Sequence, residues 1–121
     1  MNSPFGEILR QAVLATPGAV GGALAASDGE TVDSWSNWEH EEWLLLTAHF
    51  GVVINHIRSA LHTFHFGDIK LLQFRYRTLD LIIQLVEGDY YVILAIAPPV
   101  HLGVAASRLQ TAADSLRMEM G

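Results

Sequence analysis

Hydrophobic and polar positions follow two different periods along this chain. At the N-terminus the apolar positions recur at intervals of three and four, which predicts a helix that begins at Ser3-Pro4. Residues 19–35 show a different pattern, in which two short segments of small and apolar residues flank the turn signal Asp28-Gly29. This pattern is typical of a β-hairpin, with strands over 19–26 and 31–35.

The longest apolar segment has a helical period and lies in the middle of the chain. We predict one helix over 38–64, preceded by the Ser-x-x-Glu form of a capping box at Ser36 and Glu39. Alternating segments then predict three strands, over 69–77, 79–86 and 90–97. After Pro98-Pro99, a last helix is predicted from an apolar stripe of Leu102, Ala105, Ala106, Leu109, Ala112, Ala113, Leu116 and Met120.

The predicted order of elements is helix, two strands, helix, three strands, helix. This order indicates an α+β sandwich of one domain, 1–121, built on a five-stranded, mostly antiparallel sheet. The long helix is expected on one face of the sheet and the two terminal helices on the other. We expect the terminal helices to cover a run of small residues that permits close packing: Gly21, Gly22, Ala23 and Ala25.

The long middle helix lacks a charged face. The stripe expected to face the sheet comprises Leu46, Phe50, Val53, Ile54, Ile57, Ala60, Leu61 and Phe64. The opposite side is also without fixed charge and comprises Leu44, Leu45, Ala48, Val52, Asn55, His56, Ser59, His62 and Thr63. A helix that is apolar or uncharged nearly all round is usually buried on more than one side.

A second copy of the chain is the expected cover for this outer side, because no other predicted element remains to cover it. In a twofold-symmetric dimer the same surface of each copy contacts the other. The residues expected at this contact are Leu45, Ala48, Val52, Asn55, His56 and Ser59 of the helix, with Leu72, Phe74 and Tyr76 of an edge strand. The alternative is a partly exposed helix whose surface simply lacks charge.

Composition and charge argue against several classes of function. The chain has 7 basic and 13 acidic residues and a net charge of −6, which argues against a nucleic-acid-binding surface. Lys70, Arg75 and Arg77 are close in sequence but are expected to form no patch of groove size. The N-terminus is unlike a signal peptide, and the apolar segment 44–57 is shorter than the ~20 residues of a membrane span. The expected location is therefore the cytoplasm.

No catalytic signature accompanies these patterns. The chain has no cysteine, no phosphate-binding loop of the G-x-x-x-x-G-K-[ST] type, no H-E-x-x-H and no G-x-S-x-G. The six histidines include His62 and His65 at helical spacing, but a zinc site needs three or four ligands. Arg58 is expected to contact a partner protein, as a charge-stabilising group for a bound nucleotide hydrolase; equally, it is typical of the exposed edge of a helix. We expect no enzyme activity, metal or cofactor.

Two segments and the order of elements resemble the roadblock family, which is named after a dynein light chain and includes MglB-like bacterial regulators of small GTPases. The segments are GAVGGALAASDGETVDSW, over 18–35, and GDYYVILAIAPPVHLGVAASRLQTAADSL, over 88–116. The resemblance covers nearly the whole chain, and the histidine-rich middle helix departs from it. It implies a homodimer or heterodimer joined through the middle helices and strand edges into one continuous sheet. It also implies function by binding, as a platform for a Ras-like GTPase or an adaptor in a motor or signalling complex.

Three hypotheses follow for the function. The leading one is a non-enzymatic dimeric module that binds and modulates a small Ras-like GTPase, or scaffolds a motor or signalling complex. The second is a small-molecule sensor of similar shape with a ligand between helix and sheet, although bulky Phe50, Ile57, Leu61 and Phe64 argue against a cavity there. The third is a metal-dependent enzyme built on the histidines.

Overall fold

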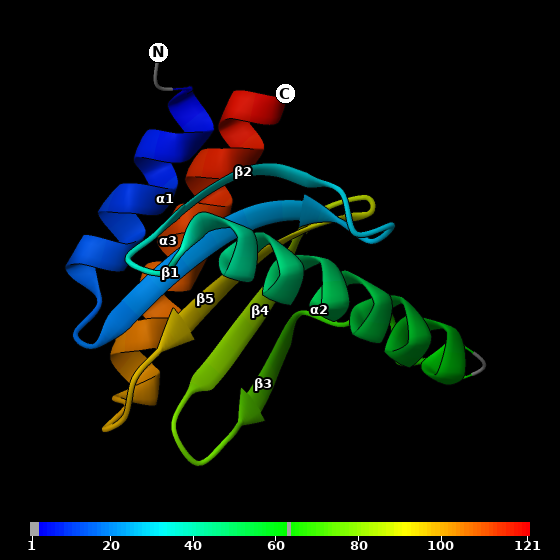
Figure 1. Cartoon of the computed structure of the whole chain (residues 1–121). Coiled ribbons are helices and arrows are strands. Elements are labelled where there is room, and N and C mark those ends of the chain that lie inside the picture. Colours follow the sequence, from blue (N-terminus) through cyan, green and yellow to red (C-terminus); the bar gives the residue numbers. More distant parts are fainter. Residues whose placement is uncertain (1–2, 63) are drawn as a thin grey trace.

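The computed structural model of the chain describes residues 3–62 and 64–121, in which three helices cover the two faces of one five-stranded antiparallel sheet (Figure 1). The elements are α1 (Pro4–Ala15), β1 (Ala19–Ala26), β2 (Thr31–Ser36), α2 (His40–Leu61), β3 (Leu71–Arg75), β4 (Asp80–Glu87), β5 (Tyr90–Ile96) and α3 (Leu102–Met120). The strand order is β2-β1-β5-β4-β3. The predicted α+β class and order of elements are confirmed. Thr63 lies outside the described residues.

Helix α1 begins as predicted, whereas α2 begins differently. The Ser3 hydroxyl accepts the N–H of Gly6 and Pro4 occupies the first turn. The predicted capping box is wrong, because Ser36 still pairs with Gly21 as the last residue of β2. The carboxylate of Glu39 caps α2 instead and accepts the N–H groups of Glu41 and Glu42.

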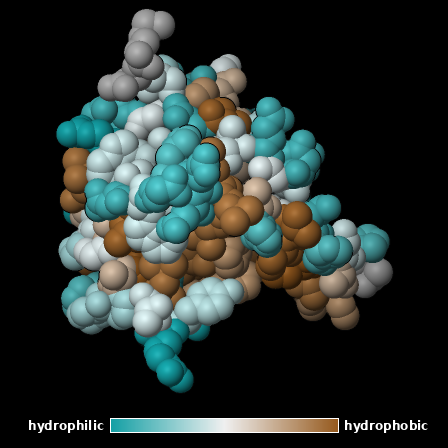
Figure 2. Space-filling model, viewed as in Figure 1, coloured by the Kyte–Doolittle hydropathy of each residue, from teal (hydrophilic) through white to brown (hydrophobic). Residues whose placement is uncertain are grey.

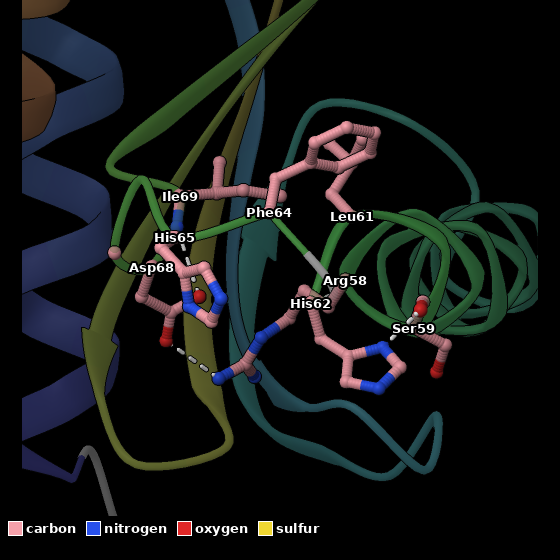
Figure 3. A pocket seen from close by; sticks show the side chains of 9 residues that line it. Arg58, Ser59, Leu61, His62, Phe64, His65, Asp68 and Ile69 are labelled. Carbon is pink, nitrogen blue, oxygen red and sulfur yellow. Dashed lines mark hydrogen bonds and ion pairs between the residues drawn. The ribbon is translucent and has the colours of Figure 1, made fainter.

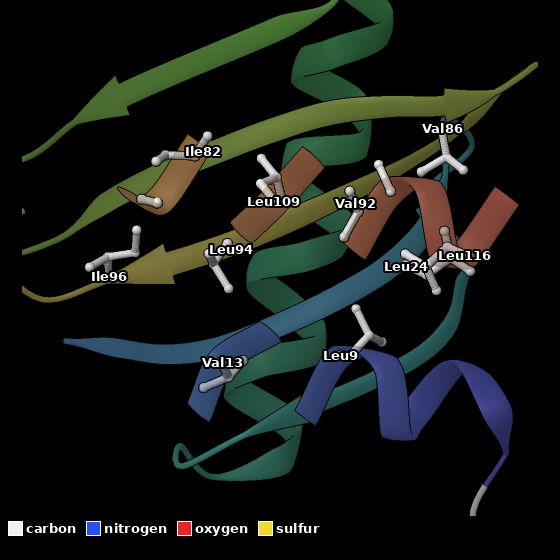
Figure 4. Packing of buried hydrophobic residues seen from close by; sticks show 12 residues of the cluster. Leu9, Val13, Leu24, Ile82, Val86, Val92, Leu94, Ile96, Leu109 and Leu116 are labelled. Atoms are coloured by element: carbon white, nitrogen blue, oxygen red, sulfur yellow. The ribbon is translucent and has the colours of Figure 1, made fainter. Parts of the chain in front are cut away.

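One core lies between the sheet and the two terminal helices (Figure 4). On this face β1 contributes Leu24, and a Cβ at Gly22 would lie 3.3 Å from Val13 of α1. The other small residues of β1 alternate to the opposite face, because successive side chains of a strand point to opposite sides. The expectation that the terminal helices cover all of them is therefore wrong. Helix α2 packs over Gly21, Ala23 and Ala25.

Helix α2 packs on its face of the sheet through three buried side chains, Trp43, Phe50 and Ile54. Buried Tyr91 of β5 lies beneath the helix, and its hydroxyl donates to the carbonyl oxygen of Thr47 at 3.0 Å. Burial, with a smaller contribution from Asp28, raises the pKa of Tyr91 well above its usual range. Tyr91 therefore stays neutral and remains a donor to the helix.

Gly51 lets α2 approach the β1–β2 turn closely. A Cβ at this position would lie 2.9 Å from the Tyr91 hydroxyl and 3.1 Å from the Cα of Gly29. We predict that Gly51→Ala lowers the free energy of unfolding by about 1–3 kcal/mol, the usual effect of overpacking, as measured by urea denaturation. The matched control is Gly103→Ala in α3, where a Cβ meets nothing within 4 Å. Gly103→Ala should leave stability unchanged or raise it, and equal losses in the two variants would contradict this packing argument.

The C-terminal end of α2 extends past the end of the sheet (Figure 1). The middle of the helix already lies against the β1–β2 turn at Gly29, so its last turns have no strand beneath them. Ala60, Leu61 and Phe64, predicted to face the sheet, are exposed for this reason, and the helix ends at Leu61 rather than Phe64. Over its 22 residues the helix is about 33 Å long at 1.5 Å per residue.

Candidate interaction surface

The outer side of α2 is exposed and uncharged. Leu45 is 61% exposed and Val52 is 52% exposed. Asn55, His56 and Ser59 are also exposed, while Ala48 is half-buried. Figure 2 shows hydrophobic residues gathered where α2 crosses in front of the sheet. The residues singled out on the helix thus share one accessible face.

The edge strand β3 continues this apolar surface. Its register with β4 places Leu72 opposite Ile83 and Phe74 opposite Leu81, on the α2 side of the sheet. The rings of Phe50 and Phe74 are in edge contact, with centroids 5.2 Å apart, which joins helix and strand. Leu72 and Phe74 are half-buried and Tyr76, just beyond the strand, is exposed. Helix α2 and the β3 edge therefore form a single surface.

The two edges of the sheet differ in their fitness to pair with another strand. β3 pairs with β4 residue by residue from Leu71 to Arg75, so its free edge is regular. On the other edge, the register of β2 shifts opposite Leu24 and Ala25. The carboxylate of Asp33 on β2 also binds the Ser3 hydroxyl and the Ser34 N–H. Bulges and charges protect edge strands from pairing, so β3 is the edge suited to extend the sheet.

Arg58 holds the loop that follows α2. Its guanidinium lies 2.7 Å from the carboxylate of Asp68 (Figure 3). It also lies 3.6 Å from the carboxylate of Asp89 in the β4–β5 turn. These ion pairs connect the C-terminal end of α2 to the loop after it and to the β4–β5 turn of the sheet. The loop and the helix end border an open hollow of about 650 Å³, next to the stacked rings of Phe64 and Phe66. The contact of Arg58 with a partner stays a prediction.

Removing the Arg58 side chain should loosen this loop. We predict that Arg58→Ala speeds amide hydrogen exchange over 64–70 and lowers global stability by on the order of 1 kcal/mol or less, because Asp68 and Asp89 are exposed. The matched control is Arg10→Ala, which removes an exposed ion pair with Glu7 on α1. Unchanged exchange in the loop of the Arg58 variant would contradict its anchoring role.

The histidines do not converge on a metal site. Among the described residues, no group of three or more His, Cys, Asp or Glu side chains is placed to hold a metal ion. The Nδ1 of His62 bonds to the carbonyl of Ser59, and that of His49 bonds to the carbonyl of Leu45. These local contacts within the helix turn account for two of the exposed rings.

By length and composition, α2 is the one helix of the described chain that is long and apolar enough to cross a membrane. Its side chains Trp43, Phe50 and Ile54 are instead buried against the sheet. A core helix of this kind passes the same test, so the composition of α2 does not establish a membrane span.

No family model and no curated protein matches the chain. Solved structures match it over nearly its whole length. A Roadblock/LC7 domain from Streptomyces avermitilis has a TM-score of 0.86 at 14% identity, over 94% of this chain and 95% of that one. MglB from Myxococcus xanthus has a TM-score of 0.88 at 11% identity, over 98% and 95%. MglC from Myxococcus xanthus has a TM-score of 0.70 at 20% identity, over 97% and 99%.

Proposed function

We propose that this chain, which has the roadblock fold that its sequence resembles, is a non-enzymatic interaction module that works as a symmetric dimer and binds a small Ras-like GTPase. The observation that carries the proposal is the uncharged, exposed outer side of α2 beside a regular free strand edge. A second copy covers both features at once, because the outer side of α2 can pack against the same side of another α2 and the free edge of β3 can pair with another β3.

The spacing of the exposed residues on α2 supports an antiparallel pair of helices. A twofold axis at Val52 places Leu45 of one copy opposite Ser59 of the other, and Ala48 opposite His56. Each of these pairs joins a small residue to a larger one, so the helices can approach closely. The same axis brings the acidic first turn of one helix beside the histidine-containing end of the other. Antiparallel helix dipoles favour this arrangement as well.

The edge strand β3 is compatible with the same symmetry. Antiparallel pairing about Gln73 sets Leu72 of one copy opposite Phe74 of the other on the α2 side of the sheet. Two sheets then join into one, with the paired helices lying over the joined edge. Both copies therefore contribute to the surface that the joined sheet and the paired helices form.

The class of partner comes from the family resemblance. Ras-like GTPases are the partners that it implies for bacterial members, and a motor or signalling assembly is the other class of partner. The second hypothesis, a ligand between helix and sheet, is disfavoured because Trp43, Phe50, Ile54 and Tyr91 fill that space. Of the residues cited against that cavity from the sequence, Phe50 does fill the interface, whereas Leu61 and Phe64 are exposed. The cytoplasm is the compartment we propose.

Two measurements test the proposal. Sedimentation velocity over a concentration series should give the mass of two chains, and a single-chain mass at tens of micromolar would contradict the dimer. Titration calorimetry should then detect binding of a Ras-like GTPase, starting with one encoded beside the gene for this chain, in its GDP form and with a non-hydrolysable GTP. Failure to bind either form would refute the proposed partner. Turnover of GTP with and without the dimer separates activation from scaffolding.

A further inference from the structure

The α3-facing side of β3 is left uncovered. The register with β4 places Leu71, Gln73 and Arg75 on this side, because Gln73 pairs with Ile82 of the core beneath α1 and α3. All three are exposed, whereas α3 packs on β4 and β5. A strip of sheet surface therefore remains open between α3 and the free edge.

A hollow of about 400 Å³ with polar and apolar lining lies at one end of this strip, between α3, β4 and the start of β3. Lys70 and Arg117 both line it, together with the amide side chains of Gln84 and Gln110. Arg117 already bonds to the Asp114 carboxylate at 3.0 Å and to the carbonyl of Val86. Within the described chain Lys70 has no ion pair, so it supplies the unmatched positive charge of the hollow.

Arg75 provides a second basic group, whose charge the Asp80 carboxylate balances within one copy. Its Nε donates to the buried carboxylate of Asp80 at 3.0 Å, while its side chain remains 71% exposed. In one copy this guanidinium lies at the far end of β3 from Lys70. Pairing of two β3 strands about Gln73 changes this, because Arg75 of one copy then lies opposite Leu71 of the other and beside its Lys70.

We infer that the joined β3 strands complete two basic hollows, each formed by Lys70 of one copy and Arg75 of the other, that bind an acidic segment of a protein partner. This inference rests on the proposed dimer. A Lys ammonium and an Arg fork at one site suit carboxylates. Gln84 donates to Gln110 and Gln110 donates to Asp114, so these amides form the wall of the hollow. Leu71 and Ala106 supply apolar contact for the stems of Asp and Glu side chains.

Charge favours a short acidic segment over a nucleic acid. The chain carries a net charge of −6, so the dimer as a whole repels a long polyanion. A short peptide that places two or three carboxylates in a hollow avoids most of that repulsion. The hollow is also too small to follow a nucleic-acid backbone over several nucleotides.

The probe is a fluorescein-labelled peptide that repeats Glu-Leu-Glu-Ala, with binding followed by fluorescence anisotropy at low salt. Lys70→Gln and Arg75→Gln should each weaken binding about tenfold while the sedimenting mass stays that of a dimer. Glutamine at position 75 keeps an N–H group for Asp80, which protects the edge of the sheet. The matched control, Arg108→Gln on the face of α3 that borders α1, should leave binding unchanged.

A mixed dimer tests whether the two copies share each site. When one copy carries Lys70→Gln and the other Arg75→Gln, one hollow loses both cations and the other keeps both. The mixed dimer should therefore bind one peptide with the affinity of the unmodified protein. Two weakened sites in the mixed dimer would place each site within one copy and overturn the inference.

The outcomes separate this inference from the proposed function. If the chain sediments as a single copy, the proposed function fails and the shared hollow fails with it. If the chain is a dimer but the peptide does not bind, or if both Gln variants bind it unchanged, only the inference is overturned. Tighter binding of a single-stranded RNA than of the peptide, lost in the same variants, also overturns it in favour of a nucleic acid.

Discussion

Glutamate at both Leu45 and Val52 should convert the proposed dimer to a monomer. Val52 lies at the twofold axis of the proposed helix pair, so its two copies would place carboxylates against each other. Like charges across an interface cost several kcal/mol, and each 1.4 kcal/mol is tenfold in affinity. The dissociation constant, measured by sedimentation velocity, should therefore rise on the order of a hundredfold or more. We substitute Leu45 and not Ala48, because Ala48 is half-buried and lies against Gly29 of the β1–β2 turn.

The fold itself should survive this change, because both side chains are more than half exposed. The unfolding midpoint of the monomeric variant should differ from that of the parent chain only by the stabilisation that dimerisation adds. Leu14→Glu is the matched control, since Leu14 is an equally exposed leucine on α1, across the sheet from α2. A dimer that persists in the Leu45 and Val52 variant, or is lost in the Leu14 control, would show that α2 is not the contact.

Local patterns in the sequence predict most of the elements of this fold. The hairpin strands and the last helix follow from turn residues and from regular apolar spacing, and they lie where these signals place them. Ile93 and its neighbours make β5 apolar on both sides, and the strand is buried on both faces. Its central place between β1 and β4 could not be predicted, because pairing between distant strands leaves no local signal.

The orientation of α2 is the feature that the sequence predicts least well. An uncharged helix gives no polar side to orient it, so the predicted stripe shared only part of its residues with the observed one. Phe50 and Ile54 face the sheet as predicted, whereas Trp43, Thr47 and Gly51 are buried without having been singled out. Their spacing of four along the helix was the available signal. Thr47 and Gly51 do not stand out in a hydrophobic pattern, because they are small. They are buried because α2 lies close to its neighbours there.

The basic residues in and beside β3 illustrate a different limit. From the sequence, Lys70, Arg75 and Arg77 form no patch of groove size, and within a single copy Lys70 and Arg75 stand at opposite ends of the strand. The proposed symmetric pairing would reverse that separation, because antiparallel strands bring the start of one beside the end of the other. A site of this kind is a property of the assembly, and the sequence pattern of one chain cannot predict it.

Trp43→Ala should have the largest effect on stability of any single substitution in α2. Trp43 is only 1% exposed and packs directly over Gly21, where a Cβ would lie 2.9 Å from its ring. Removing a buried Trp side chain typically costs about 3–5 kcal/mol, since apolar contact is lost and a cavity remains. The free energy of unfolding from urea denaturation should fall by that amount. Because this contact seats the N-terminal half of α2 on the sheet, dimer affinity should fall with it.

Trp38→Ala separates the contribution of burial from that of aromatic contact. Trp38 precedes α2 and meets Trp43 edge to face, with ring centroids 5.9 Å apart, but it is itself exposed. Its loss should cost about 0.5–1.5 kcal/mol, the value of an aromatic pair, and should leave the dimer intact. Trp43→Phe should fall between the two, because it keeps a ring over Gly21 and removes an indole N–H that has no hydrogen-bond partner among the described residues. Equal losses of unfolding free energy for Trp38→Ala and Trp43→Ala would mean that the packing of α2 on the sheet depends on Phe50 and Ile54 instead.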